Sequence, residues 1–194
     1  MARTRVIDRD AVLDAAERVV SRDGAARMTL EAVAHEAGIS KASVLYDYKS
    51  KQALIKAIIE RLIERENLRL RDCIANLGPV PDAVMRGRIA STMPLISEAD
   101  RAVALNLVAA LAGHAALRGS IHEAYRHHID EVVQASSQPN AAMLAFLALE
   151  GLRLMECFGF YTWSQKERER MLNDIESLLQ GDEDAAPVSA AAKS

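Results

Sequence analysis

The 194-residue sequence predicts an all-α protein, because a helix-favouring composition is combined with apolar residues at helical spacing and well-placed capping residues. Half of the residues are hydrophobic and 26% are charged, whereas only 4% are aromatic and glycine and proline together number fourteen. Abundant alanine, leucine, arginine and glutamate favour helices and give strands little support. The length allows one large domain, or two small domains that share a core.

The first 56 residues predict three short helices, each preceded by a capping residue and followed by a break. Two short helices around a glycine-containing turn, here Gly38-Ile39, are the plan of a helix-turn-helix. The predicted helices are the segment between Asp8 and Gly24, with Gly24 expected in the left-handed conformation, then 30–37 capped by Thr29, and 41–46 capped by Ser40.

A longer helix is predicted over 51–76, capped by Ser50 and ended by the Gly-Pro-Val-Pro stretch at 78–81. Glycine and proline then divide the rest of the chain into helices near 82–93, 98–113, 115–136, 139–159 and 164–180. The expected domains are 1–50, which holds the helix-turn-helix, and 51–180, followed by 181–194 as a disordered tail without periodicity.

Composition also excludes several classes of protein. The longest uncharged run, about 102–113, is far short of the ~20 apolar residues that a membrane span needs. The charged Asp8 precedes any apolar stretch long enough for a secretory signal. The two cysteines, Cys73 and Cys157, are too few for a disulfide framework. The sequence therefore predicts a soluble cytoplasmic protein with no membrane partner.

Charge is divided unevenly along the chain. Residues 1–56 hold ten Lys and Arg against eight Asp and Glu, and residues 57–194 hold fourteen against nineteen, which together give the net charge of −3. A sequence pI near 6.0 argues against non-specific coating of DNA, but it is compatible with a small basic head on an acidic body.

The predicted helix over 41–46 carries polar side chains suited to DNA. Lys41, Ser43 and Tyr46 share its outer face, and Lys49 and Lys51 follow where the chain would pass a phosphate backbone. Four lysines and one acid lie between residues 38 and 56, and such charges favour salt-sensitive DNA binding. The alternative is an ordinary helical hairpin with a solvated face.

At these residues the sequence closely resembles the tetracycline-repressor (TetR) family of bacterial regulators. The shared features are the glycine-ended first helix, the Thr29 cap, the Ala-Gly-Ile-Ser-Lys turn at 37–41, and Lys-Ser-Lys at 49–51. The resemblance implies a three-helix DNA-binding domain, followed by a roughly six-helix ligand-binding and dimerisation domain. It also implies a homodimer that represses transcription until a small apolar or amphipathic molecule releases it from a near-palindromic operator.

The resemblance also implies the residues that face DNA. Lys41 and Ser43 are the candidates for reading base edges, while the hydroxyl or amide of Thr29 would bind a phosphate. The complete set is Thr29, Ser40, Lys41, Ser43, Tyr46, Lys49 and Lys51.

Three positions depart from the family pattern. Leu45 stands where a phosphate-binding tyrosine is usual, and Asp47 where a histidine is common, so Asp47 is expected to point away from DNA. Tyr48 occupies the position of a core phenylalanine and is expected to be buried.

Two further sets of residues follow from the resemblance in the second domain. Residues on helices that surround the family's pocket are candidates to line a cavity, although ordinary core packing is the commoner role of such residues: Met85, Met93, Leu107, Leu111, His114, Met143 and Phe146. The last two helices are expected to pair with those of a second chain, or else to cover only their own chain, through Phe146, Leu149, Leu152 and Met155.

Neither a catalytic site nor a metal or cofactor site is predicted. The segment from His122 to His127 superficially resembles a zinc-peptidase motif, but the second histidine falls five residues after the first and the rings would diverge by ~140°. Two other functions stay open: a helical module whose head binds protein or no longer reads DNA, and an enzyme with a histidine site.

Overall fold

The structure, a computed structural model, describes residues 8–113 and 115–180, without the side chains of residues 112, 113, 115 and 116. All regular elements in this part of the chain are helices, which confirms the predicted fold class. They are α1 (Arg9–Asp23), α2 (Leu30–Glu36), α3 (Lys41–Asp47), α4 (Lys51–Leu77), α5 (Ala83–Thr92), α6 (Glu98–Gly113), α7 (Ala115–Gln134), α8 (Pro139–Phe158), α9 (Gln165–Ser177) and the 3₁₀ turn η1 (Leu178–Gln180).

The capping residues recognised in the sequence begin their helices as expected. Asp8 accepts hydrogen bonds from two amides of the first turn of α1, and Thr29, Ser40 and Ser50 each accept one from the third residue beyond. Gly24 differs from expectation: its φ of 83° is positive, but its ψ of 150° lies outside the left-handed helical region. Gly159, at the end of α8, does adopt that conformation, with φ 65° and ψ 26°.

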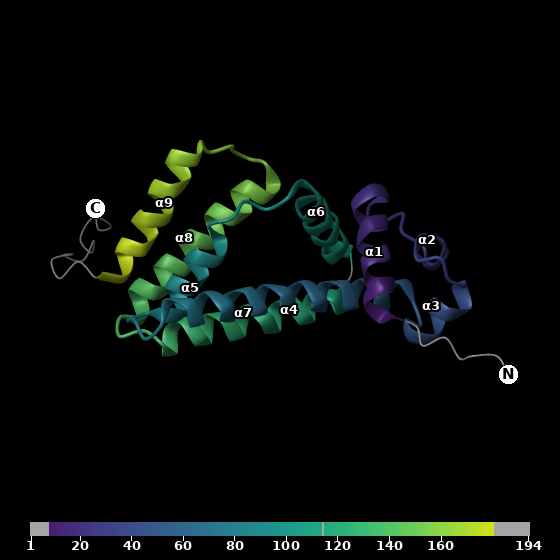
Figure 1. Ribbon diagram of the computed structural model, residues 1–194, viewed down its shortest axis with the longest axis horizontal. Coiled ribbons are helices and arrows are strands. Elements are labelled where there is room, and N and C mark those ends of the chain that lie inside the picture. Colours follow the sequence, from purple (N-terminus) through teal and green to yellow (C-terminus); the bar gives the residue numbers. More distant parts are fainter. Residues whose placement is uncertain (1–7, 114, 181–194) are drawn as a thin grey trace, which may run out of the picture.

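The helices form an elongated molecule with a head (α1–α3) at one end and a body (α4–α9) extending from it (Figure 1). The long helix α4 leaves the head and runs beside α7, while α5, α8 and α9 pack together at the far end. Helix α6 contacts both α1 and α8, so it links the head to α8 of the body.

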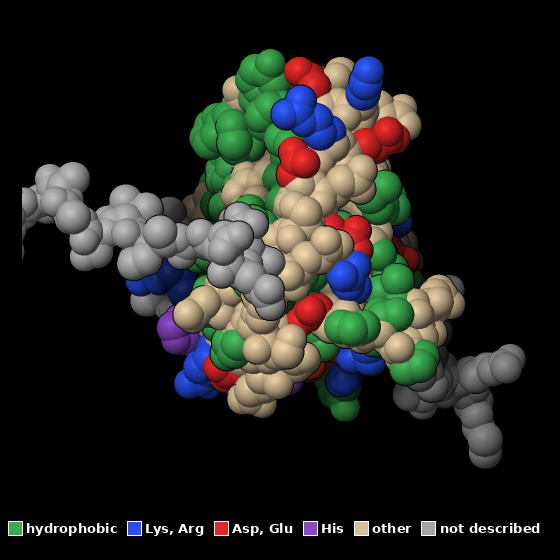
Figure 2. Space-filling view, turned by 90° about the vertical axis from the view of Figure 1, so that its left-hand side faces the viewer, with side chains coloured by type: hydrophobic (Ala, Val, Ile, Leu, Met, Phe, Trp, Pro, Cys, Tyr) green, Lys and Arg blue, Asp and Glu red, His purple; other side chains and the backbone are tan. Residues whose placement is uncertain are grey.

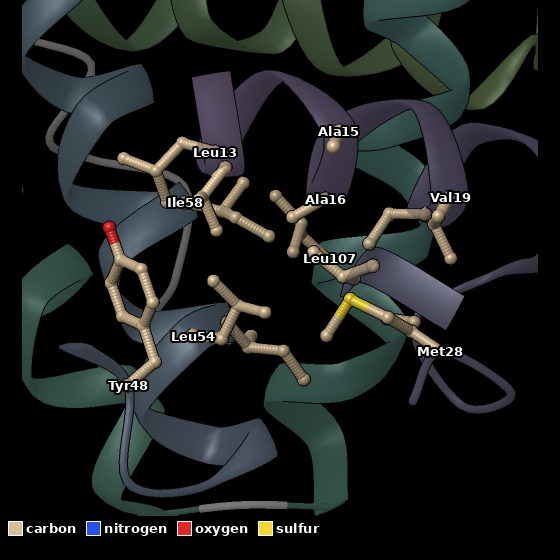
Figure 3. Packing of buried hydrophobic residues seen from close by; sticks show 14 of the residues in the cluster. Leu13, Ala15, Ala16, Val19, Met28, Tyr48, Leu54, Ile58 and Leu107 are labelled. Carbon is tan, nitrogen blue, oxygen red and sulfur yellow. The ribbon is translucent and has the colours of Figure 1, made fainter. Parts of the chain in front are cut away.

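The head and body share the first of two hydrophobic cores. The inner face of α1, including Ala16 and Val19, packs against Leu54 and Ile58 of α4 and against Leu107 of α6 (Figure 3). All five residues are at least 96% buried. Helices α4 and α6 therefore complete the core of α1–α3, and the head is packed directly against both of them.

The second core lies at the far end of the body. Met85 of α5, Phe146 and Leu149 of α8, and Leu172 of α9 form its centre and are almost completely buried. No helix in the two described ranges has both the length and the apolar character required to span a membrane.

Candidate nucleic-acid interface

Helix α3 is held in the head by one side and exposes the other. Val44 is fully buried in the first core, and Ile39 in the preceding turn packs against the same core. Outward-facing side chains include Lys41, 54% exposed, Leu45, 38% exposed, and Tyr46, 74% exposed. Lys41 and Tyr46 thus lie on the exposed side of α3, Ser43 is half-buried, and Leu45 adds an apolar side chain to the exposed side.

Two serines define the start of α3. The Ser40 hydroxyl oxygen accepts a hydrogen bond from the Ser43 amide at 3.1 Å, and the two side-chain hydroxyls are 2.8 Å apart. The cap fixes the first turn of α3, and it partly occupies the hydrogen-bonding capacity of Ser43.

Tyr46 and Lys49 are joined at the other end of α3. The Lys49 ammonium donates a 2.6 Å hydrogen bond to the Tyr46 carbonyl and lies 5.2 Å from the centre of the Tyr46 ring. This contact holds a positive charge and a phenol side by side on the surface, although the two residues lie on either side of the helix end.

Thr29, Lys41 and Lys51 surround one open hollow of about 430 Å³. The Lys51 ammonium donates to the Ala26 carbonyl at 2.5 Å, and the Lys41 ammonium lies 3.4 Å from the Glu31 carboxylate. Thr29 Oγ1 accepts from the Ala32 amide, so its own O–H remains able to donate. The structure therefore brings three of the seven candidate DNA-binding residues together.

Asp47 is paired rather than directed into this polar surface. Its carboxylate accepts hydrogen bonds from Nε and Nη2 of Arg9 at 3.1 and 3.0 Å, and only 7% of its side chain is exposed. Tyr48 is buried, as expected for core packing, and this burial raises the pKa of its phenol. The pairing with Arg9 offsets the negative charge of Asp47 at the end of α3.

Sequence reasoning missed two arginines in this region. Arg9 lies 38 residues from Asp47 in the chain, so no local pattern relates them. Arg27 is exposed and lines the same hollow as Thr29. The sequence did contain a signal for Arg27, because this basic residue lies two positions before the Thr29 cap.

The candidate pocket residues that the structure describes are distributed over different parts of the body. Two belong to the second core, two belong to or pack against the first core, Met93 is 49% exposed, and Met143 is partly buried. His114 lies outside the described residues. The core members are Met85 and Phe146 in the second core, and Leu107 and Leu111 at the first.

The residues expected at a dimer interface also occupy two different faces of α8. Phe146, Leu149 and Leu152 are at least 95% buried within their own chain, so they are not surface residues as the interface expectation requires. Met155 is 38% exposed. The exposed face of α8 instead presents Leu144, Leu147, Leu154, Met155 and Phe158.

The histidines of α7 do not converge. His122 and His127 are exposed, whereas His128 is partly buried and lies 2.9 Å from Asn67 Oδ1. Among the residues described, no group of three or more His, Cys, Asp or Glu side chains is placed to hold a metal ion.

Two family profiles match the sequence. The profile described as "Tetracyclin repressor-like, C-terminal domain" matches residues 82–180, and the profile described as "Bacterial regulatory proteins, tetR family" matches residues 12–58. The first spans 99 of the 194 residues, just over half of the chain. None of the curated proteins matches the sequence.

Solved structures share the fold at low sequence identity. A transcriptional regulator from Streptomyces coelicolor A3(2) has a TM-score of 0.71 at 18% identity, covering 89% of this chain and 98% of that chain. A TetR-family regulator from Mesorhizobium loti has a TM-score of 0.70 at 19% identity, covering 88% of this chain and 94% of that chain. A regulator from Saccharomonospora viridis in complex with choline has a TM-score of 0.68 at 18% identity, covering 87% of this chain and 95% of that chain.

The head geometry and the two profiles agree. An exposed α3, anchored by Val44 and flanked by lysines, lies within the segment that matches the regulatory-protein profile, and the six-helix body contains the repressor-like segment. The chain belongs to the TetR family and is a DNA-binding transcriptional regulator.

Proposed function

We propose that the protein is a dimeric repressor whose two heads bind a near-palindromic operator, and that a small molecule bound in the body releases it. The observation that carries the proposal is the head surface, where three basic side chains, Lys41, Lys49 and Lys51, flank an exposed recognition helix anchored by buried Val44.

Within the head, α3 enters the major groove. Lys41 and Ser43, in its first turn, are the side chains proposed to reach base edges. Thr29, Ser40, Tyr46, Lys49 and Lys51 then contact phosphates around it, which fixes the head on the duplex without reading sequence. The Lys41–Glu31 ion pair is exposed on both sides and costs little to exchange for a DNA contact.

Dimerisation is proposed through the exposed face of α8, together with α9. Leu144 and Leu147 are 60% and 56% exposed, and Leu154 continues the same apolar surface at 49%. A Cβ placed on Gly151 would meet nothing within 4 Å in the chain itself, so this position leaves room for close approach of a second helix. Figure 2 views the end of the body that lies far from the head and shows further hydrophobic side chains in its upper part.

A ligand response is proposed because α6 joins the first core to the body. Val103 and Leu107 of α6 are buried against the head, so a ligand that favours another position of α6 also changes the head. Choline in the Saccharomonospora viridis regulator and imidazole in the multidrug-binding protein EbrR support a small-molecule ligand in this fold.

The test is fluorescence anisotropy of purified protein on DNA selected from a random pool, compared with scrambled DNA at several salt concentrations. We expect selective binding with two chains per site. Lys41→Ala and Ser43→Ala should reduce the preference for the selected DNA, while Arg126→Ala, at an exposed arginine on α7, serves as the control.

Failure to select any DNA sequence would contradict the proposed DNA reading and favour a helical module with another partner. Selection of a DNA with one chain per site would retain DNA reading and contradict the dimer. The alternative that the protein is an enzyme predicts stoichiometric metal in the purified protein and loss of an activity in His122→Ala. The proposed regulator requires neither a metal nor an activity.

A further inference from the structure

Arg88 of α5 is a buried cation whose hydrogen bonds are incomplete. The residue is 4% exposed, and its Cζ lies 5.5 Å from the centre of the Phe146 ring. Nε and Nη2 are both shielded from solvent and have no hydrogen-bond partner among the described residues. Because a buried guanidinium without acceptors is unfavourable, this arrangement requires an explanation beyond packing.

The two free nitrogens form one edge of the guanidinium, and that edge binds carboxylates elsewhere in this protein. Nε and Nη2 are the fork that can donate two hydrogen bonds to one carboxylate. Five other arginines use it in this way: Arg9 on Asp47, Arg22 on Asp23, Arg61 on Glu17, Arg101 on Glu98 and Arg168 on Glu156, with N–O distances from 2.6 to 3.4 Å.

The acidic side chains near Arg88 do not occupy its free edge. Glu131 Oε2 is 3.7 Å from Nη2, beyond hydrogen-bond distance, and the Glu131 side chain is 42% exposed. Glu150 accepts from Tyr125 at 2.8 Å and from Arg153 at 3.0 Å. Glu66 is also paired with Arg153, at 3.0 Å. Glu131 therefore forms an ion pair with Arg88 without a hydrogen bond, and Glu66 and Glu150 are hydrogen-bonded or ion-paired to other side chains.

Aromatic rings of α7 and α8 contact one another beside Arg88, and the outermost, Tyr125, is 41% exposed. Tyr125 lies edge-on to Phe146 with ring centres 6.5 Å apart, and His128 lies edge-on to Tyr125 at 6.3 Å. Burial, together with the nearby Arg88 charge, lowers the pKa of His128 to about 4, so the imidazole is neutral at pH 7. Among the described residues Arg88 thus has no hydrogen-bonded acid, and the Phe146 ring lies beside its guanidinium.

We propose that Arg88 binds the carboxylate of a small organic acid through its Nε–Nη2 edge, with Phe146 and Tyr125 against the apolar part of the acid. The two hydrogen bonds satisfy Nε and Nη2 of the guanidinium, and the rings pack against a hydrocarbon or aromatic group of the acid. This assignment deepens the proposed ligand response, because it gives the chemical class of the effector.

Direct binding tests the assignment without DNA. Full-length protein labelled with ¹⁵N is titrated with acetate, benzoate and octanoate, and with their neutral counterparts acetamide, benzamide and octanamide. The readout is the Nε–H NMR signal of Arg88, identified by its absence in Arg88→Met. We expect benzoate or octanoate to move this signal downfield and to bind at least tenfold more tightly than the matching amide.

Three variants locate the binding site. Arg88→Met should weaken binding of the acid at least tenfold, whereas Arg126→Met, at an exposed arginine of α7, should leave it unchanged. Glu131→Gln should strengthen binding, because it removes the negative charge nearest to Nη2. If Arg88→Met fails to fold, Arg88→Lys keeps a cation but lacks the two-nitrogen edge, and it should lose the preference for acid over amide.

The outcomes are distinct from those of the DNA experiment. The assignment is overturned if no acid moves the Arg88 signal, if amides bind as tightly as acids, or if the affinity is equal in wild type and Arg88→Met. An acid that binds at Arg88 yet does not release operator DNA would support the site and contradict its proposed role as the effector site. Absence of DNA binding contradicts the proposed function alone.

Discussion

Asp47, at the end of the recognition helix, is neutralised by Arg9 at the start of α1. Two guanidinium nitrogens of Arg9 donate to one carboxylate oxygen of Asp47 at 3.1 and 3.0 Å. The pair joins the start of α1 to the end of α3 and offsets the negative charge of Asp47 next to the surface that is proposed to face phosphates.

Arg9→Ala should therefore weaken both the head and its DNA binding. Loss of the pair leaves the shielded Asp47 carboxylate without its cation, which we expect to lower the free energy of unfolding by about 1 kcal/mol. Urea unfolding and DNA anisotropy measure the two effects. Arg18→Ala, which breaks an exposed α1–α2 ion pair with Glu36, is the matched control. In Arg9→Ala/Asp47→Asn, DNA affinity should recover; no recovery would show that Arg9 itself contacts DNA.

Lys51→Gln should change the salt dependence of DNA binding more than its sequence preference. Each lost phosphate contact reduces the slope of log K against log salt by about 0.9, so two heads should lose about 2. Anisotropy titrations at four salt concentrations, on selected and scrambled DNA, provide the measurement. A slope equal to that of wild type would place Lys51 away from phosphate, held by its bond to the Ala26 carbonyl.

Gly151→Ala distinguishes a close helix interface from an open surface. Alanine favours a helix by about 1 kcal/mol over glycine, and the added Cβ meets nothing within the chain, so the variant should stabilise a monomer. At a close α8–α8 contact the same methyl group should instead weaken the dimer. Sedimentation over a concentration series measures this, with Gly119→Ala on α7, also in open space, as the control.

Leu147→Glu tests the same surface more severely. A carboxylate on this 56% exposed position should dissociate the dimer while leaving the helical circular dichroism of the chain intact. Leu68→Glu, on an α4 side chain that is 48% exposed, should remain dimeric. A dimeric Leu147→Glu protein would move the interface away from this face of α8.

Acid should destabilise the body partly through His128. The pKa of His128 is about 4 in the folded chain, against 6.5 for a fully solvated histidine, so the unfolded chain takes up a proton at a higher pH. The neutral His128 side chain contributes its full stability above pH 6.5, and this contribution is lost as the pH falls toward 4. Between pH 7 and pH 5 the free energy of unfolding should fall by about 1–2 kcal/mol for this reason. Urea unfolding of His128→Gln at these pH values should show a shallower decline, with His122→Gln as the control for loss of an exposed histidine.

Local signals in the sequence predicted the helices well because capping is a local interaction. Asp8, Thr29, Ser40 and Ser50 each bond to amides within three residues, and the predicted helix starts agree with the structure to within one residue. The helix ends are less exact where no glycine intervenes: α7 ends at Gln134 rather than 136, and α9 changes to a 3₁₀ turn after Ser177.

The faces of α8 were harder to predict, because the helix is apolar nearly all round. Phe146 and Leu149 are buried, while Leu144 and Leu147 are exposed, yet spacing alone makes either pair a candidate for the core. Arg88 illustrates a second difficulty, since only tertiary packing decides that an arginine on a short helix lies beneath an aromatic ring. The same holds for Arg9, whose partner is 38 residues away.

The shared first core also limits how this regulator can be recombined with others. A chimera joined after residue 50 would separate Ala16 and Val19 from Leu54, Ile58 and Leu107, and so would cut through one packed unit. A transplanted head needs the matching first turns of α4 and the facing turn of α6 from the same parent. Exchange of DNA specificity between relatives is therefore expected to succeed by substitutions on the outer face of α3, where Lys41 and Tyr46 can change without disturbing any buried neighbour.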